Sequence, residues 1–183
     1  MYKILVLIFC IILSSCKAQR KTQNFEFKSI GWTVSFPKNA YSSIKKIKDA
    51  DTSFVDKYAT KVLLHLQHEK DNSFTATLDK LDSTRFTNWE EAFLESKKNV
   101  LQYILAAQPN YRIVDSLSSF ETIGSVQFRK FYFRTLNTIT QDYHNTYWFS
   151  GWKHNFQIGV TISFTDDNIG KIYIDQLTNS VFK

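Results

Sequence analysis

The chain has 183 residues, with 23 lysine and arginine residues against 17 aspartate and glutamate residues, which gives a net charge of +6. This length suits one folded domain with a short additional segment. The basic residues are dispersed and form no stripe with interleaved aromatic residues, which argues against a nucleic-acid-binding protein. Both cysteines, Cys10 and Cys16, lie near the amino terminus. The sequence after Cys16 therefore offers no disulfide, no thiol nucleophile and no cysteine ligand for a metal.

The first residues have the pattern of an export signal. Lys3 supplies a positive charge, and Ile4–Leu13 is an uninterrupted apolar run. That run is too short to cross a membrane as a helix, which takes roughly twenty residues, but it fits the apolar region of a signal peptide. Residues 1–15 are therefore predicted to be a signal peptide that is removed on export.

The segment Leu13-Ser14-Ser15-Cys16 resembles the bacterial lipobox, in which a branched residue and two small residues precede a cysteine. The resemblance implies that a diacylglycerol is attached to the Cys16 thiol and that the chain is cut before Cys16. It also implies that the new amino terminus is acylated, with palmitate as a typical acyl chain. Two or three such chains hold a protein stably on a membrane. The alternative is an ordinary secretory signal that happens to end in a cysteine.

Residues 16–24 are polar and basic, and they are predicted to be a lipidated, flexible tether. Their cations could lie against anionic lipid. Lipoproteins of the Bacteroidota type that are displayed on the cell surface carry an acidic cluster after the cysteine, whereas this tether is basic. The resemblance therefore favours a protein of the cell envelope that faces the periplasm. Of the two membranes, the outer membrane is favoured over the inner membrane as its anchor.

A single folded domain is predicted over residues 25–183, and alternating apolar and polar residues mark its strands. Residues 38–58 have no clear pattern beyond a loop with a helical turn. An irregularity at Arg129-Lys130 indicates a β-bulge. The clearest strand is Phe156–Phe164, whose apolar side chains fall on every second residue. The other predicted strands are Phe25–Phe27, Trp32–Phe36, Lys61–Glu69, Ser73–Leu81, Tyr111–Leu117, Ser125–Leu136 and Tyr143–Trp152.

Two helices are predicted. Thr87-Asn88-Trp89-Glu90 has the form of a capping box, with Thr87 bonded to a free amide and Glu90 reaching back. Apolar residues then follow helical spacing until Pro109, which ends the helix. A final helix follows Asp166 or Asp167, either of which can cap it.

Antiparallel strands interrupted by one long helix and followed by another predict an α+β fold. The sheet is expected to have about 6–8 strands and to be flanked by both helices. The opening strand Trp32–Pro37, the mid-chain helix, the long alternating strand and the closing helix resemble, in their order, the PsbP-like fold. That fold occurs in thylakoid-lumen proteins and in small bacterial lipoproteins. Photosystem-binding residues of the family have no matching positions in this sequence, so none is carried over.

No pattern for metal, cofactor or catalysis is found in the sequence. His65 and His68 lie three residues apart on a predicted strand, which points them to opposite faces and argues against a shared metal. There is no His-Glu-x-x-His pattern and no Gly-x-Ser-x-Gly elbow, and the glycines are isolated. A site assembled from dispersed Ser, His and Asp residues stays open.

Aromatic residues crowd the predicted strand Tyr143–Trp152. Alternation places Trp148, Trp152 and His144 on one face of it. These three residues are candidates for stacking against a sugar or peptide, or for anchoring a protein partner. The alternative is that a helix covers this face and the tryptophans are ordinary core residues.

Taken together, these patterns predict a lipid-anchored envelope lipoprotein that acts as a non-catalytic binding or assembly module. Its expected partners are the membrane, through Cys16, and an envelope protein. One alternative is a small periplasmic hydrolase, which would need a deep cleft that brings His144 or His68 beside a carboxylate. Another is a protective lipoprotein that blocks a toxin through a flat complementary patch.

Overall fold

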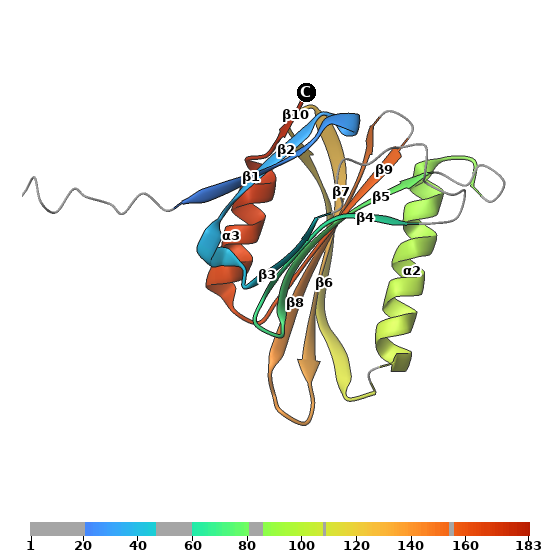
Figure 1. Ribbon diagram of the computed structural model, residues 1–183. Coiled ribbons are helices and arrows are strands. Elements are labelled where there is room, and N and C mark those ends of the chain that lie inside the picture. Colours follow the sequence, from blue (N-terminus) through green and yellow to red (C-terminus); the bar gives the residue numbers. More distant parts are fainter. Residues whose placement is uncertain (1–20, 47–59, 81–85, 108, 154–155) are drawn as a thin grey trace, which may run out of the picture.

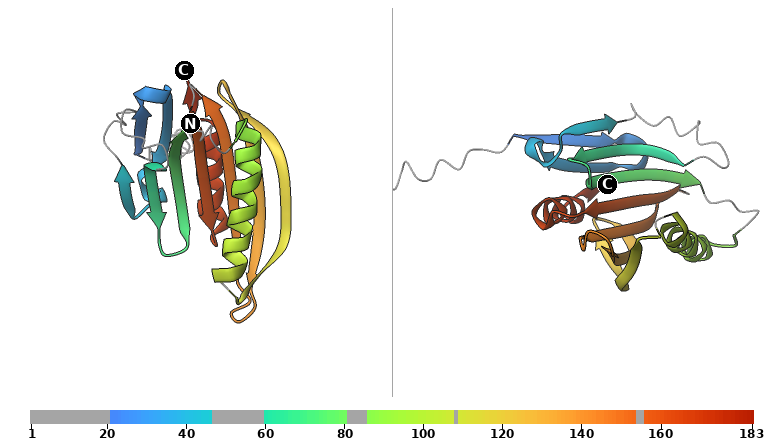
Figure 2. Two further views of the ribbon diagram at one scale, coloured as in Figure 1. Left: turned by 90° about the vertical axis from the view of Figure 1, so that its right-hand side faces the viewer. Right: turned by 90° about the horizontal axis from the view of Figure 1, so that it is seen from below.

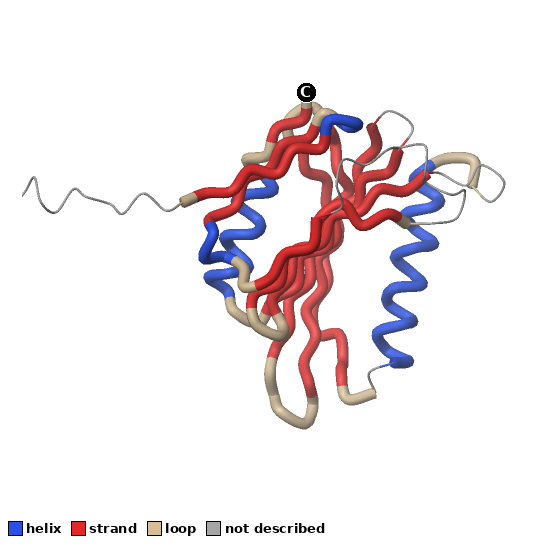
Figure 3. Tube along the Cα trace, in the orientation of Figure 1, coloured by secondary structure: helices blue, strands red, loops and turns tan. Residues whose placement is uncertain are grey.

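The computed structural model describes residues 21–46, 60–80, 86–107, 109–153 and 156–183. The predicted signal peptide and Cys16 lie outside these residues, as does most of the segment 38–58 that has no clear pattern in the sequence. Within the described residues, the chain forms two antiparallel sheets and two α-helices (Figures 1 and 3). The α+β fold expected from the sequence is confirmed.

The larger sheet has seven strands in the order β3-β4-β5-β9-β8-β7-β6, and every neighbouring pair is antiparallel. The strand predicted most clearly, Phe156–Phe164, is β9, and it pairs with β5 on one side and β8 on the other. The predicted strands Lys61–Glu69 and Ser73–Leu81 correspond to β4 and β5, which pair as an antiparallel hairpin. The strands span Ser43–Lys46 (β3), Lys61–His68 (β4), Asn72–Lys80 (β5), Tyr111–Ile123 (β6), Val126–Asn137 (β7), Tyr143–Lys153 (β8) and Phe156–Phe164 (β9).

The smaller sheet has the order β1-β2-β10 and was not foreseen as a separate layer. Its strands are β1 (Thr22–Phe27), β2 (Trp32–Pro37) and β10 (Val181–Phe182), and the short 3-10 helices η1 (Lys28–Ile30) and η2 (Lys38–Ala40) follow β1 and β2. Because β1 begins at Thr22, the last three residues of the predicted tether belong to a strand. They are polar because β1 is an edge strand, where Gln23 accepts a hydrogen bond from the Tyr41 hydroxyl.

Helix α3 (Asp167–Thr178) lies beside the small sheet on one face of the large sheet and packs against both sheets (Figure 1). Its Tyr173 ring contacts Phe36 of the small sheet and Phe74 of the large sheet, so one side chain joins all three layers. The Tyr173 hydroxyl donates a hydrogen bond of 2.8 Å to the Ala40 carbonyl oxygen inside this core. Asp166 caps the helix by accepting hydrogen bonds from the backbone amides two and three residues later.

Helix α2 (Trp89–Ala107) lies on the opposite face of the large sheet (Figure 2). It packs there through a second, smaller core of Phe93, Phe131 and Phe133, separate from the main one. Trp148 stacks on Phe93 with ring centroids 4.8 Å apart. The helix thus has its own attachment to the sheet.

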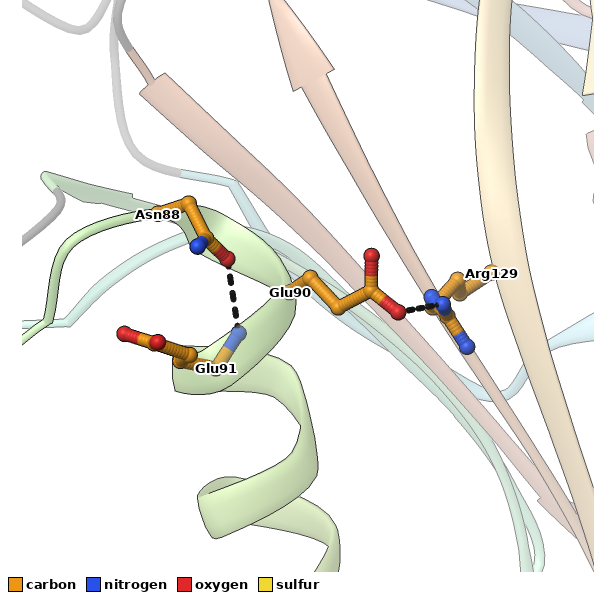
Figure 4. Close-up of polar contacts among 4 residues, drawn as sticks. All are labelled: Asn88, Glu90, Glu91 and Arg129. Carbon is orange, nitrogen blue, oxygen red and sulfur yellow. Dashed lines mark hydrogen bonds and ion pairs between the residues drawn. The ribbon is translucent and has the colours of Figure 1, made fainter.

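In the structure, the capping residues at the start of α2 lie one residue later in the sequence than predicted (Figure 4). Asn88, in place of Thr87, accepts the hydrogen bond from the Glu91 amide at 3.1 Å. Glu91, in place of Glu90, reaches back to the Thr87 amide and hydroxyl. Glu90 instead forms an ion pair with Arg129 of β7, a contact that the local sequence pattern does not reveal.

The prediction of a β-bulge at Arg129-Lys130 is wrong. The pairing of β7 with its neighbours β6 and β8 is regular at these residues. Phe128 packs into the main core, whereas Phe131 packs beneath α2. The break in alternation therefore reflects a strand that is buried on both faces. The register of β6 against β7 shifts elsewhere, between Ile113 and Asp115.

Candidate functional site

A polar cleft of about 680 Å³ lies where three connections meet at one end of the large sheet. The connections are the β4–β5 turn, the β7–β8 turn and the junction of β9 with α3, which come from distant parts of the sequence (Figure 3). The cleft therefore exists only in the folded domain.

The walls of the cleft are fixed by buried or turn-forming asparagines. The side-chain oxygen of Asn72 accepts hydrogen bonds from the Thr165 and Asp166 amides at 3.1 and 3.0 Å, and this side chain is buried. It ties the β4–β5 turn to the start of α3. On the β7–β8 turn, the Asn137 side chain accepts hydrogen bonds from the Ile139 and Thr140 amides. Such side-chain bonds hold a turn in one conformation, so the cleft is preformed.

The cleft carries charges of both signs. Lys70 and Arg134 supply cations, and Asp71, Asp142 and Asp167 supply carboxylates. A site with interspersed charges suits a polar partner that itself carries both signs.

Arg134 is held in place by stacking. Its guanidinium carbon lies 3.9 Å from the centroid of the Tyr143 ring, which is a cation–π geometry. Its Nε is buried and has no hydrogen-bond partner among the described residues. A buried donor without a partner costs stability, and Arg134 is one of the residues that line the cleft.

His144, one of the three residues singled out in the sequence, lines the same cleft. Burial lowers the pKa of its imidazole from 6.5, and the nearby Asp71 carboxylate partly opposes that shift. The ring is therefore neutral at pH 7. Its Nε2 is buried without a partner among the described residues.

The two tryptophans predicted to share a surface with His144 lie elsewhere along β8. Trp148 is half-buried beneath α2 against Phe93. Trp152 lies eight residues from His144, about 26 Å at 3.3 Å per residue, and is half-buried. The structure thus brings none of the three side chains together, and their joint binding role stays a prediction.

His65 and His68 lie on β4. The His65 Nδ1 lies 2.9 Å from the Thr75 hydroxyl of the neighbouring strand. Among the residues that the structure describes, no cluster of three or more histidine, cysteine or acidic side chains could hold a metal ion. No helix in that part of the chain is long and apolar enough to cross a membrane.

The sequence analysis missed Lys70, Asn72 and Arg134 as site residues. Residues 70–72 fall between two predicted strands, and Arg134 falls within the predicted strand Ser125–Leu136. The usable signal was the accumulation of charged and amide side chains at strand ends, because loops carried by a rigid sheet often hold binding residues.

No protein-family model matches the chain, and no curated protein is significantly similar to it. Among solved structures, the chain is similar to the solution structure of cyanobacterial PsbP (CyanoP) from Synechocystis sp. PCC 6803. The TM-score is 0.58 at 12% sequence identity, and the match covers 92% of this chain and 98% of that one. The domain therefore has the PsbP-like α+β fold that its order of elements predicted.

Proposed function

We propose that the protein is a lipid-anchored lipoprotein of the cell envelope that acts as a non-catalytic binding module. The observation that carries the proposal is the preformed cleft with charges of both signs. Its proposed partner is a polar segment of an envelope protein. The lipobox pattern at Cys16 and the PsbP-like fold, which resembles that of small bacterial lipoproteins, support the anchored location.

A small hydrolase is the second candidate, because His144 and Asp71 line one cleft and His144 is neutral at pH 7. A neutral imidazole can act as a general base. The base must lie within hydrogen-bond reach of the nucleophile or its water, however, and the buried Nε2 of His144 contacts no hydroxyl among the described residues. The geometry therefore favours binding over catalysis.

Site-specific photo-cross-linking in the native envelope tests the binding proposal. A photoreactive residue replaces Thr140, which is exposed on the β7–β8 turn at the cleft, and the matched control replaces the exposed Lys171 of α3. We expect a defined protein to be captured from position 140 and not from position 171. Equal capture from both positions, or none from position 140, would count against the cleft as the binding site.

Two further variants separate the parts of the proposal. Cys16→Ser should move the protein from the membrane fraction to the soluble fraction and remove the mass of the lipid, whereas Cys10→Ser should change neither. For the hydrolase alternative, the full chain is screened against ester, amide and glycoside substrates together with His144→Gln. A turnover that His144→Gln abolishes would replace the binding module with the hydrolase.

A further inference from the structure

Strand β6 forms one outer edge of the large sheet, and Figure 2 shows it there with no described strand beside it. It is 13 residues long and contains no proline, glycine or lysine. Leu117 and Phe120 on it are 61% and 56% exposed. Natural proteins usually protect such edges with proline, lysine or bulges, because the free backbone groups can pair with another strand. Here a single bulge near the start of the strand is the main protection.

Two shallow grooves lie near β6, one over the sheet on the side of α3 and one lined by residues of α2. On the side of α3, Leu117, Lys130 and Tyr132 line a shallow groove of about 410 Å³. On the side of α2, Leu94 and Leu101 line a groove of about 390 Å³. Lys97 in that second groove donates a hydrogen bond to Ser118 of β6, which places the groove next to the strand. Grooves on both faces of a free edge are the features that β-strand addition uses.

We propose that a second copy of this chain occupies the edge, with β6 pairing antiparallel to β6 around a twofold axis at Leu117. Leu117 is the midpoint of Tyr111–Ile123, so this register uses the whole strand. It also places the two exposed Leu117 side chains against each other on the axis. The seven-stranded sheets then form one continuous sheet across two molecules.

The bulge makes this register complementary in charge. Val114 is the extra residue between Ile113 and Asp115, so the count shifts by one beyond it. Arg112 then lies opposite Glu121 of the second copy. Both side chains lie on the face of the sheet that carries α3, because Arg112 pairs with Leu136 and Glu121 contacts Lys130, two β7 residues of that face. The full set of opposed residues is Leu117 with Leu117, Ser116 with Ser118, Asp115 with Ser119, Ile113 with Phe120, and Arg112 with Glu121.

Neighbouring registers lose these pairings. Moving the axis to Ser118 places Asp115 opposite Glu121 of the second copy twice, and directly opposed like charges destabilise a sheet. Moving it to Ser116 places Leu117 opposite Asp115. The Leu117 register is therefore the one in which exposed apolar side chains and opposite charges meet.

Cysteine cross-linking of the full chain in its envelope tests the proposal. Opposed residues of an antiparallel pair have Cα atoms about 4.5–5.5 Å apart, which is within disulfide range. Leu117→Cys should therefore give an oxidised dimer of twice the chain mass on a non-reducing gel. Ser116→Cys is the matched control, because its two copies lie about 7–8 Å apart and cannot bridge. Combining Ser116→Cys with Ser118→Cys should restore the dimer, and the chain without an added cysteine should give none.

A charge swap provides an independent readout on the Leu117→Cys background. Adding Arg112→Glu should reduce the dimer yield roughly tenfold, because two ion pairs become two repulsive pairs. Adding both Arg112→Glu and Glu121→Arg should restore it. Leu117 and Arg112 are exposed, so their substitution does not put folding at risk. Glu121 is half-buried and pairs with Lys130 of its own chain, so the fold of the double variant is checked separately. The proposal is overturned if no dimer forms, if Ser116→Cys cross-links as readily as Leu117→Cys, or if Leu117→Cys captures only a different protein.

Discussion

Replacing Phe93 with alanine should release α2 from the sheet and leave the main core folded. Phe93 is 2% exposed and is the central side chain of the small core beneath α2. It stacks on Trp148, and the Arg129 guanidinium lies 5.7 Å from its ring centroid. The main core around α3 shares none of these buried side chains.

The magnitude follows from the loss of this buried aromatic side chain. A buried Phe→Ala substitution costs about 3–5 kcal/mol. The contacts of α2 with the sheet also include the Glu90–Arg129 ion pair, the Lys97–Ser118 hydrogen bond and the Lys97 ammonium 4.1 Å from the Phe131 ring centroid, and exposed pairs contribute about 0–1 kcal/mol each. In proteins, most of the stability of a helix comes from the tertiary packing of its apolar face. We therefore expect the undocked α2 to unfold.

Hydrogen exchange followed by mass spectrometry measures this directly. Amides of α2 should exchange about a hundredfold faster or more in Phe93→Ala, while those of β5, β9 and α3 should keep their protection. Leu94→Ala is the matched control, because its side chain is 51% exposed on the same helix. If protection falls equally in α2 and α3, the two cores unfold as one unit and the reasoning is wrong.

Three further predictions concern single residues. Gly170→Ala should lower the free energy of unfolding in urea by about 1–3 kcal/mol, since an added Cβ would lie 2.4 Å from Phe164 ring carbons; an unchanged midpoint would contradict this. Tyr173→Phe should cost about 1–3 kcal/mol in the same assay, because it leaves the buried Ala40 carbonyl oxygen without its donor, and a stability equal to wild type would exclude that role. Burial lowers the pKa of His144, so the unfolded chain binds the proton more tightly and wild-type stability should fall as pH drops below 6.5. His144→Gln should show a smaller loss over that window, and parallel pH profiles for the two proteins would refute the assignment.

Alternation in the sequence predicted strands well where one face is buried and the other is open to polar groups. In β9 (Phe156–Phe164), every even-numbered residue is apolar. The structure places all of these side chains in the main core or packed against it. The same rule failed in β7, because α2 covers one face of that strand and the main core, which Phe128 enters, covers the other. A strand that is buried on both faces does not alternate between apolar and polar residues. The interrupted alternation in its sequence was therefore misread as a bulge.

Long-range contacts set the details that local patterns missed. The capping box shifted by one residue because Glu90 pairs with Arg129, 39 residues away. The small sheet was not foreseen because β2 pairs with β10 at the far end of the chain. Two residues of β10 carry too little pattern to predict a strand, although Phe182 stacks on Trp32 with ring centroids 5.5 Å apart.

The candidate site was harder to predict than the fold. His144 was identified from its place on an aromatic strand, but its neighbours in the cleft come from turns that are separated in sequence. Asn72 joins two of these turns through hydrogen bonds across more than 90 residues. The sequence of a polar turn such as residues 70–72 does not show which side chain is buried and supports the cleft and which one faces solvent.

The cleft and the free edge meet at Tyr111, which begins β6 and also lines the cleft. In the proposed pairing, Thr122 of the second copy lies opposite Tyr111, so dimerisation would add a second chain at the rim of each cleft. A partner that contacts this rim then binds monomer and dimer with different affinities, and linkage requires that the partner shift dimerisation by the same factor. Photo-cross-linking from position 140, repeated with Leu117→Cys before and after oxidation, measures that coupling. Equal capture in the two states would show that the edge and the cleft act independently.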